Sequence, residues 1–214
     1  MRQKIYIQYG AGASGPEAWL NFDSSPTLRA ARLPLVGRLV RSPFPTTVRY
    51  GDIVQGLPVA DESAAGVYAS HILEHLSRQD CIAALRNSLR VLRRGGRFRL
   101  IVPNLRARAA RYLAAEDDAT AADQFLRTCL IGAEQSERSL SSRLRRVVGN
   151  SHHRWMWDVN SMTAALRSAG FVGIRPCELG DSGDSMFDLV EETSRFRDPE
   201  LGIAECALEA FRPA

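Results

Sequence analysis

The sequence lacks any run of about 18 consecutive apolar residues, the length that a helix needs to cross a membrane. Its N-terminal stretch, MRQKIYIQYGAG, also lacks an apolar segment of signal-peptide length before the glycines. These two absences predict a cytoplasmic protein without a membrane span.

Closely spaced cysteine pairs are missing as well. No C-x-x-C motif occurs, which argues against a zinc knuckle and against a dithiol redox motif. We expect reduced, mostly packed thiols at the four cysteines, which are Cys81, Cys129, Cys177 and Cys206.

Lysine is nearly absent, since 28 residues are Lys or Arg and only Lys4 is a lysine. A net charge of +4 carried by arginine could indicate a surface that binds phosphate or nucleic acid. The arginines are scattered, however, apart from a cluster at 138–146, and no nucleic-acid-binding motif accompanies them. We therefore favour arginine-biased codon usage and do not expect a nucleic-acid partner.

Apolar residues alternate with polar ones, or gather in short runs, at several places along the chain. Ile5, Ile7 and Tyr9 alternate in this way, and a chain of 214 residues that is 45% hydrophobic suits one domain. The pattern predicts an α/β fold, a mainly parallel sheet with helices on both faces. Further strands are expected at 19–23, 47–50, 67–70, 98–102, 171–174 and 204–211, and helices from Ser77 to Gly95-Gly96, over 106–131 and over 158–169.

A glycine-rich turn follows the first expected strand directly. Gly10 and Gly12 allow the backbone to approach a ligand closely. Asp23, at the end of the second strand, can accept hydrogen bonds from ribose hydroxyls, and Asp52, after the third, from an adenine amino group. Ligands of open α/β sheets bind at the carboxyl ends of the strands, where these residues are expected.

These motifs resemble those of class I S-adenosylmethionine-dependent methyltransferases of the glycan- and small-molecule-modifying type. The resemblance covers nearly the whole chain in the expected order. Its segments are Tyr9-Gly-Ala-Gly12 with Trp19-Leu-Asn21-Phe-Asp23, Val67-Tyr-Ala-Ser70-His71-Ile-Leu-Glu74-His75, Leu89 to Leu105 around Gly95-Gly96, and His153-Arg-Trp-Met-Trp-Asp158 with Leu166 to Phe171.

The resemblance implies a Rossmann-like fold with a seven-stranded, mainly parallel sheet, and S-adenosyl-L-methionine as the cofactor. Tyr9, Gly10 and Gly12 would hold its methionine end, and Asp23 its ribose. The remaining implied contacts are Asp52 and Ile53 with the adenine, and Ser70 and His71 with the sulfonium and the acceptor.

Three features depart from the family pattern. The first motif lacks the usual third glycine and the usual early acidic residue, near whose place Gln8 stands. Gly66 replaces an aspartate that is common before the fourth strand, and only six residues separate Gly12 from Trp19. Parallel strands usually need a crossover of a dozen or more residues, so the first helix must be shortened or absent. One sheet face then lacks cover, and residues 28–40 are the expected cover. We thus expect a single domain over 1–214, with a lid-like segment at 24–47 and a helical insertion at 106–150.

Histidine is the residue whose pKa best suits a general base for a hydroxyl acceptor. The four histidines are confined to two motifs, and His71 is our first candidate for the base and His153 our second. A role in packing or capping the turn is an equal alternative for His71 and His75.

A metal site is a further hypothesis for the same histidines. His71, Glu74 and His75 share one face of a helical turn, and His153 could join them. A Glu-His pair at this place is also typical of metal-free relatives, so we expect no metal.

Two other groups have open roles. Tyr112, Trp155 and Trp157 could line an acceptor pocket or belong to the core. The acids of residues 180–185 could bind acceptor hydroxyls or stand on a surface loop.

The function expected from these features is methyl transfer to a small hydroxylated metabolite, a sugar or a polysaccharide precursor. The alternative is a non-catalytic scaffold or partner-binding protein that keeps the fold. Binding of S-adenosylmethionine discriminates between the two.

Overall fold

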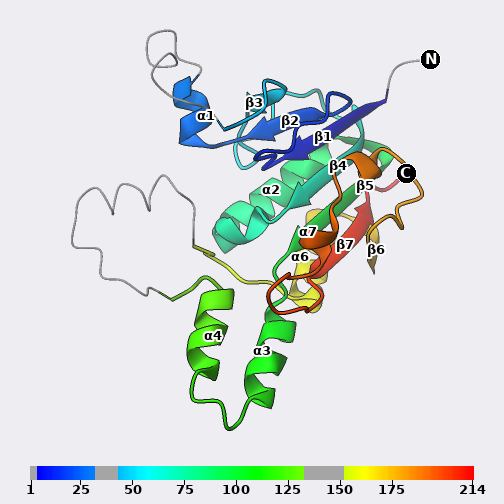
Figure 1. Cartoon of the computed structure of the whole chain (residues 1–214). Coiled ribbons are helices and arrows are strands. Elements are labelled where there is room, and N and C mark those ends of the chain that lie inside the picture. The colour runs from blue at the N-terminus through cyan, green and yellow to red at the C-terminus, as the bar shows by residue number, and fades with distance from the viewer. Residues whose placement is uncertain (1–3, 32–42, 133–151) are drawn as a thin grey trace.

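The computed structural model describes residues 4–31, 43–132 and 152–214. Its centre is one seven-stranded sheet in the order β3-β2-β1-β4-β5-β7-β6, in which only β7 runs antiparallel to its neighbours (Figure 1). This confirms the expected Rossmann-like methyltransferase fold. The strands are β1 (Ile5–Tyr9), β2 (Leu20–Asp23), β3 (Val48–Tyr50), β4 (Ala64–Ser70), β5 (Leu92–Val102), β6 (Val172–Pro176) and β7 (Cys206–Phe211).

No helix lies between β1 and β2, and the structure describes every residue of this connection. The chain instead turns back along the sheet, and the Ala11 amide donates to the Phe22 carbonyl at 3.1 Å. The buried Asn21 amide donates to the carbonyls of Pro16 and Trp19 and so holds the loop in place. The expectation of an absent first helix is confirmed.

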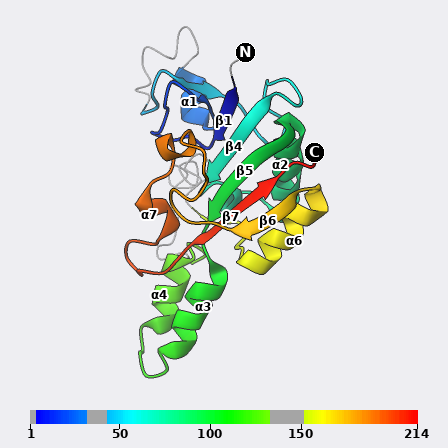
Figure 2. The ribbon, with the colours of Figure 1, turned by 90° about the vertical axis from the view of Figure 1, so that its right-hand side faces the viewer.

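Two long helices cover one face of the sheet, α2 (Arg78–Val91) and α6 (Val159–Ala169) (Figure 2). Ser77 caps the start of α2, while Asp158 and Ser161 form a capping box at the start of α6. α2 ends at Val91 and not at Gly95-Gly96, because β5 already begins at Leu92 and pairs there with β4.

The other face is covered by the connection between β6 and β7. This connection contains η2 (Phe187–Leu189) and α7 (Thr193–Phe196), and Phe187 is fully buried against Tyr6 and Trp19. The expected cover at 28–40 is described only in its first residues. There Leu28 of α1 (Pro26–Ala31) packs with a small group made up of Ala11, Phe44 and Val48, and residues 32–40 lie outside the described residues.

Gly66 is explained by this packing. A Cβ at Gly66 would lie 2.8 Å from the ring of Tyr6 and 2.9 Å from that of Phe187. Real Cβ contacts are not so short, so the departure from the family pattern at this position follows from the close approach of Phe187 to β4.

Arg99 joins the same connection to the sheet. Its side chain is 1% exposed and donates to Glu191, to Glu209 at 2.9 Å and to Asp181 at 2.8 Å. Asp184 accepts a hydrogen bond from the Tyr6 hydroxyl at 2.8 Å. The acids of 180–185 therefore have partners within the fold. These contacts favour neither the binding of acceptor hydroxyls nor a plain surface loop.

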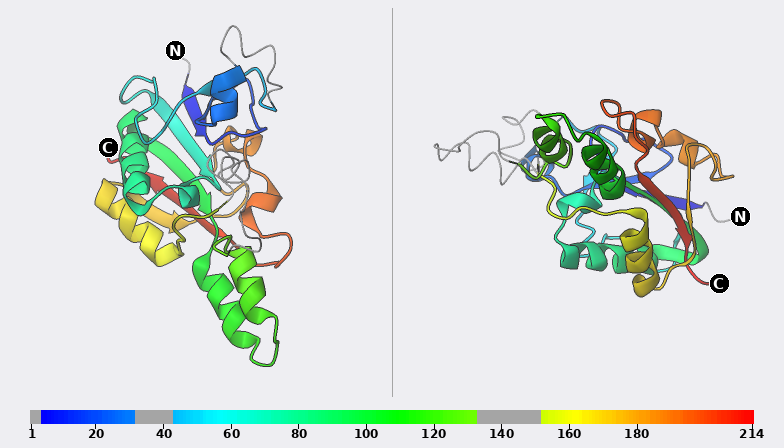
Figure 3. Two further views of the ribbon diagram at one scale, coloured as in Figure 1. Left: turned by 90° about the vertical axis from the view of Figure 1, so that its left-hand side faces the viewer. Right: turned by 90° about the horizontal axis from the view of Figure 1, so that it is seen from below.

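The expected helix over 106–131 is a hairpin of two helices, α3 (Leu105–Ala114) and α4 (Ala121–Thr128), which extends away from the sheet (Figures 1 and 3). Tyr112 and Phe125 pack together between them. Leu113 and Leu126 are apolar, yet they are 69% and 41% exposed. The hairpin packs mainly on itself, so its outer sides face solvent.

The later part of the expected insertion, 133–150, with the arginine cluster at 138–146, lies outside the described residues. In the helices that the structure describes, none combines the length and the apolar character that a membrane span requires.

Candidate functional site

Three strand ends meet at one edge of the sheet and bring the predicted cofactor residues together. The Gly12 amide donates to Oδ2 of Asp23 at 3.1 Å, and the Gly51 amide donates to the Asp23 carbonyl at 3.1 Å. Oδ1 of Asp23 accepts from the amide of Ser25 at 2.8 Å. Asp23 thus fixes the glycine turn after β1 to the loop that contains Asp52.

The two glycines of this turn have left-handed backbone conformations, with φ of +65° at Gly10 and +54° at Gly12. A Cβ at Gly10 would lie 2.7 Å from the Ile72 side chain, whereas a Cβ at Gly12 would meet nothing within 4 Å. Gly10 is therefore required by packing, while the space beside Gly12 is open to a ligand.

The side chains of Tyr9 and Ile53 point into the core. The Tyr9 hydroxyl accepts from Ser88 at 3.1 Å, and burial raises the pKa of Tyr9. Ile53 is 6% exposed and belongs to the main apolar cluster. Both could contact a cofactor only through their backbone. One carboxylate oxygen of Asp52 accepts a hydrogen bond from the Val54 amide at 2.8 Å.

His71 follows Ser70 directly at the end of β4 and has a strained backbone, with φ of +52°. Its Nε2 lies 3.1 Å from the Arg195 carbonyl, and its Nδ1 lies 3.5 Å from Oε1 of Glu74. Burial acts to lower the pKa of His71, but Glu74, the Arg195 carbonyl and Glu205 together raise it, and the net direction is upward.

His153 approaches the same carboxylate from a distant part of the chain. Its Nδ1 lies 2.8 Å from the Cys129 carbonyl and its Nε2 lies 3.9 Å from Oε1 of Glu74. Burial is the main cause of its lowered pKa. In both histidines one ring nitrogen has a backbone carbonyl as its partner and the other faces Glu74. These contacts do not test whether either ring acts as a base, and the base roles of His71 and His153 stay predictions.

A polar cavity of about 440 Å³ lies beside these histidines. The part of its wall that comes from α7 and the loop before β7 could not be predicted from the sequence, because those residues are polar and show no periodic pattern. The lining includes His71, Arg127, Thr128, His153, Glu192, Ser194, Arg195, Asp198 and Glu200, and Arg108 and Glu205 pair at its base.

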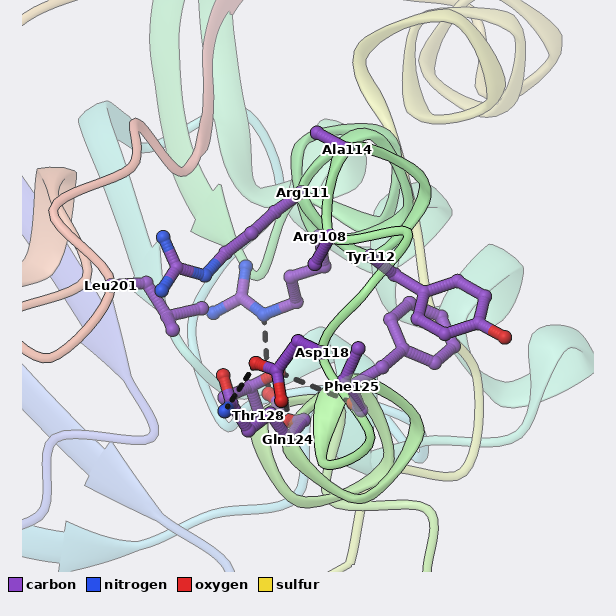
Figure 4. Close-up of a pocket in the computed structure, with 11 residues that line it drawn as sticks. Arg108, Arg111, Tyr112, Ala114, Asp118, Gln124, Phe125, Thr128 and Leu201 are labelled. Carbon is purple, nitrogen blue, oxygen red and sulfur yellow. Dashed lines mark hydrogen bonds between the residues drawn. The ribbon is translucent and has the colours of Figure 1, made fainter.

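A second cavity of about 280 Å³ lies between α3 and α4 (Figure 4). Arg108 extends into it, and its Nε donates to the Thr128 carbonyl at 3.1 Å (Figure 4). Tyr112 lines this cavity, but Trp157 is buried in the core and Trp155 is 44% exposed beside Arg78. The three aromatic residues therefore do not form one acceptor pocket.

Comparison with known proteins agrees with the geometry at the strand ends. Residues 14–100 match a family model described as a methyltransferase domain. Among curated proteins, no significant match was found.

Solved methyltransferase structures share the fold. One is a chain from the complex between the Haloferax volcanii Trm112 methyltransferase activator and a protein described as a methyltransferase, with a TM-score of 0.52, 14% identity, and coverage of 99% of this chain and 83% of that one. Another is Haemonchus contortus phosphoethanolamine N-methyltransferase 2 in complex with S-adenosyl-L-methionine, with a TM-score of 0.50, 12% identity, and coverage of 100% and 50%. The CurJ carbon methyltransferase gives the same four values.

The sheet order and the solved structures establish the fold, and the family match adds the methyltransferase domain. The chain therefore has the fold of the class I methyltransferases, and residues 14–100 match the methyltransferase domain family within it.

Proposed function

We propose that this enzyme transfers the methyl group of S-adenosylmethionine to a small hydroxylated metabolite, a sugar or a polysaccharide precursor. The observation that carries the proposal is the polar cavity of about 440 Å³ beside the strand ends. Its volume lies within the range of small-molecule sites, and a wall of mixed acids, arginines and hydroxyls suits an acceptor rich in hydroxyl groups.

The residues at the strand ends fit the cofactor. The open space beside Gly12 leaves room for it, and the Asp23 carboxylate, with about four acceptor positions, can bind ribose hydroxyls in addition to the two amides. The backbone at Tyr9 and Gly10 would hold the methionine end, and Asp52 with the backbone of Ile53 the adenine. When bound, the cofactor supplies an electrophilic methyl group, and the chain aligns the acceptor with it.

Ser70 and His71 connect the two parts of the site. Ser70 ends β4 next to the glycine turn, and His71, which follows it, also lines the cavity. The acids Glu192, Asp198 and Glu200 line the cavity together with arginines, so its wall carries both charges and is not the basic surface that binds a phosphate backbone. A small acceptor therefore fits the cavity better than a nucleic acid does.

Cytoplasmic localisation is part of the proposal. All four cysteines are buried free thiols, the state that a reducing compartment maintains.

Replacing Asp23 with alanine tests the cofactor site. We expect the affinity for S-adenosylmethionine and S-adenosylhomocysteine to fall about 10- to 100-fold, because hydrogen bonds to a charged group contribute about 1.5–3 kcal/mol. Calorimetric titration measures it. Asp61→Ala is the matched control, since this exposed acid precedes β4 at the opposite edge of the sheet. Equal affinities in the two variants would contradict the assignment of Asp23.

The acceptor is tested by the release of S-adenosylhomocysteine from the wild-type protein with panels of sugars, sugar nucleotides and RNA. Turnover with a hydroxylated small molecule supports the proposal. Turnover with RNA alone would overturn the acceptor class, and tight cofactor binding without turnover on any panel would favour the scaffold alternative.

A further inference from the structure

The side chain of Glu74 is fully buried in η1 (Leu73–His75), yet neither of its carboxylate oxygens has a hydrogen-bond partner among the described residues. A buried carboxylate without a partner is costly, and the structure must compensate for it. The groups that surround Glu74 show what could do so.

Three imidazoles converge on one oxygen of this carboxylate. Oε1 of Glu74 lies 3.5 Å from Nδ1 of His71, 3.9 Å from Nε2 of His153 and 4.0 Å from Nε2 of His75. Charge-assisted hydrogen bonds between nitrogen and oxygen are about 2.7–2.9 Å long. All three separations are longer, so none of them is a charge-assisted hydrogen bond of normal length.

The far nitrogen of each ring fixes its tautomer. Nδ1 of His75 lies 3.2 Å from the His152 carbonyl, Nδ1 of His153 lies 2.8 Å from the Cys129 carbonyl, and Nε2 of His71 lies 3.1 Å from the Arg195 carbonyl. A carbonyl only accepts, so each of these nitrogens carries the hydrogen. In a neutral ring the other nitrogen then presents its lone pair toward Glu74. Metal-ligating histidines are held in this way, with the far N–H on a carbonyl or carboxylate.

The backbone holds this arrangement in place. The Glu74 carbonyl accepts from the amides of Arg154 at 2.8 Å and Trp155 at 3.1 Å, and the His153 amide donates to the Leu130 carbonyl at 3.2 Å. The segment that carries His153 is therefore bound to η1 on one side and to the end of the α3–α4 hairpin on the other.

We propose that Glu74, His75 and His153 bind a divalent transition-metal ion, with Zn²⁺ the best fit. One ligand atom from each lies within 4.8 Å of the other two. Zinc bonds of about 2.0–2.2 Å in tetrahedral geometry place ligand atoms about 3.3–3.5 Å apart, so a small inward shift closes the site. Two histidines and a glutamate are a known zinc ligand set, and the ion supplies the positive charge that Glu74 lacks. This replaces the expectation of no metal.

The location gives the ion a role in the reaction, a step that rests on the proposed function. His153 lines the polar cavity, so an ion on its Nε2 lies at the cavity wall. There it would act as a Lewis acid that lowers the pKa of an acceptor hydroxyl. His71, whose Nδ1 is nearest to Glu74, lies outside this ligand set.

Calorimetric titration of the chelator-treated full-length protein with ZnSO₄ tests the site without cofactor or acceptor. We expect one equivalent to bind, and His153→Ala and His75→Ala to weaken binding at least about 100-fold, beyond the loss usual for removal of a supporting partner. His152→Ala is the matched control, because this neighbouring side chain lies beside the Leu130 carbonyl and is not one of the candidate ligands. Failure of folded wild-type protein to bind, or an equal loss in the control, overturns the proposal.

A second measurement separates a metal from protons on the imidazoles. In the absence of zinc, Glu74→Gln should raise the melting temperature, because it removes an uncompensated buried charge. With zinc present the order should reverse, since only the wild type gains stability from the bound ion. If Glu74→Gln lowers the melting temperature equally with and without zinc, protonated histidines neutralise Glu74 and the metal site is wrong. Neither result depends on the acceptor, so failure here leaves the proposed function open to its own test.

Discussion

Replacing Gly12 with valine is expected to reduce the affinity for S-adenosylmethionine at least about 100-fold while the protein remains folded. A Cβ at Gly12 meets no atom of the chain within 4 Å, so the new side chain would occupy the space assigned to the ligand. The free energy of unfolding falls only by the cost of a left-handed conformation at a β-branched residue, about 1–2 kcal/mol. Calorimetry gives the affinity, and circular dichroism with denaturant unfolding gives the stability.

Gly95→Val is the matched control for this variant. Gly95 also has a left-handed conformation, with φ of +67°, and open space around its Cβ, but it lies at the start of β5, away from the strand ends. Gly10 is a poor test, because its Cβ would collide with Ile72 and disturb the fold. If Gly12→Val binds the cofactor as well as Gly95→Val does, the glycine turn is not the cofactor site.

Local signals in the sequence predicted the sheet and the edge that carries the candidate cofactor site. The alternation before Gly10 and the acids at Asp23 and Asp52 depend on neighbouring residues only, and the structure places them at adjacent strand ends. The absent first helix followed from the six residues between Gly12 and Trp19, since the length of a chain segment limits what it can form.

The cover of the second sheet face could not be predicted in the same way. Phe187 packs on Tyr6 and Trp19, which are far away in the sequence, and Gly66 makes room for its ring. The Gly-Asp steps just before Phe187 suggest a surface loop. In the structure Asp181 is paired with Arg99 and Asp184 accepts from the Tyr6 hydroxyl, and no local pattern indicates these contacts.

The histidine cluster could be predicted from the sequence only in part. The spacing of His71, Glu74 and His75 already placed three of its members on one turn, and His153 was a candidate because so few histidines are present. The carbonyls that fix the tautomers come from Cys129, His152 and Arg195. Backbone groups leave no signal in the side-chain pattern, so the sequence alone favoured a metal-free site.

Replacing Arg99 with methionine is expected to destabilise the protein by about 3–5 kcal/mol, because it leaves buried carboxylates without their cation. Glu209 keeps Arg175 as a partner at 2.8 Å, but among the described residues Glu191, whose side chain is fully buried, keeps only the Gly180 amide at 3.2 Å. A loss of this size is a large part of the 5–15 kcal/mol that stabilises a typical domain. Denaturant unfolding measures it, and Trp19 fluorescence reports on the cover locally, since the Trp19 indole donates to the Met186 carbonyl.

The double variant Arg99→Met with Glu191→Gln shows whether the buried charge is the cause. It should recover part of the lost stability, because a neutral amide is far less costly to bury than a carboxylate. Arg106→Met is the control for loss of an ion pair at the surface: its side chain is 72% exposed beside Asp158, and the expected change is about 0–1 kcal/mol. If the double variant is as unstable as Arg99→Met, lost packing rather than the unpaired Glu191 explains the effect. The cover of the second face would then depend on the Phe187 cluster and not on the ion pairs below it.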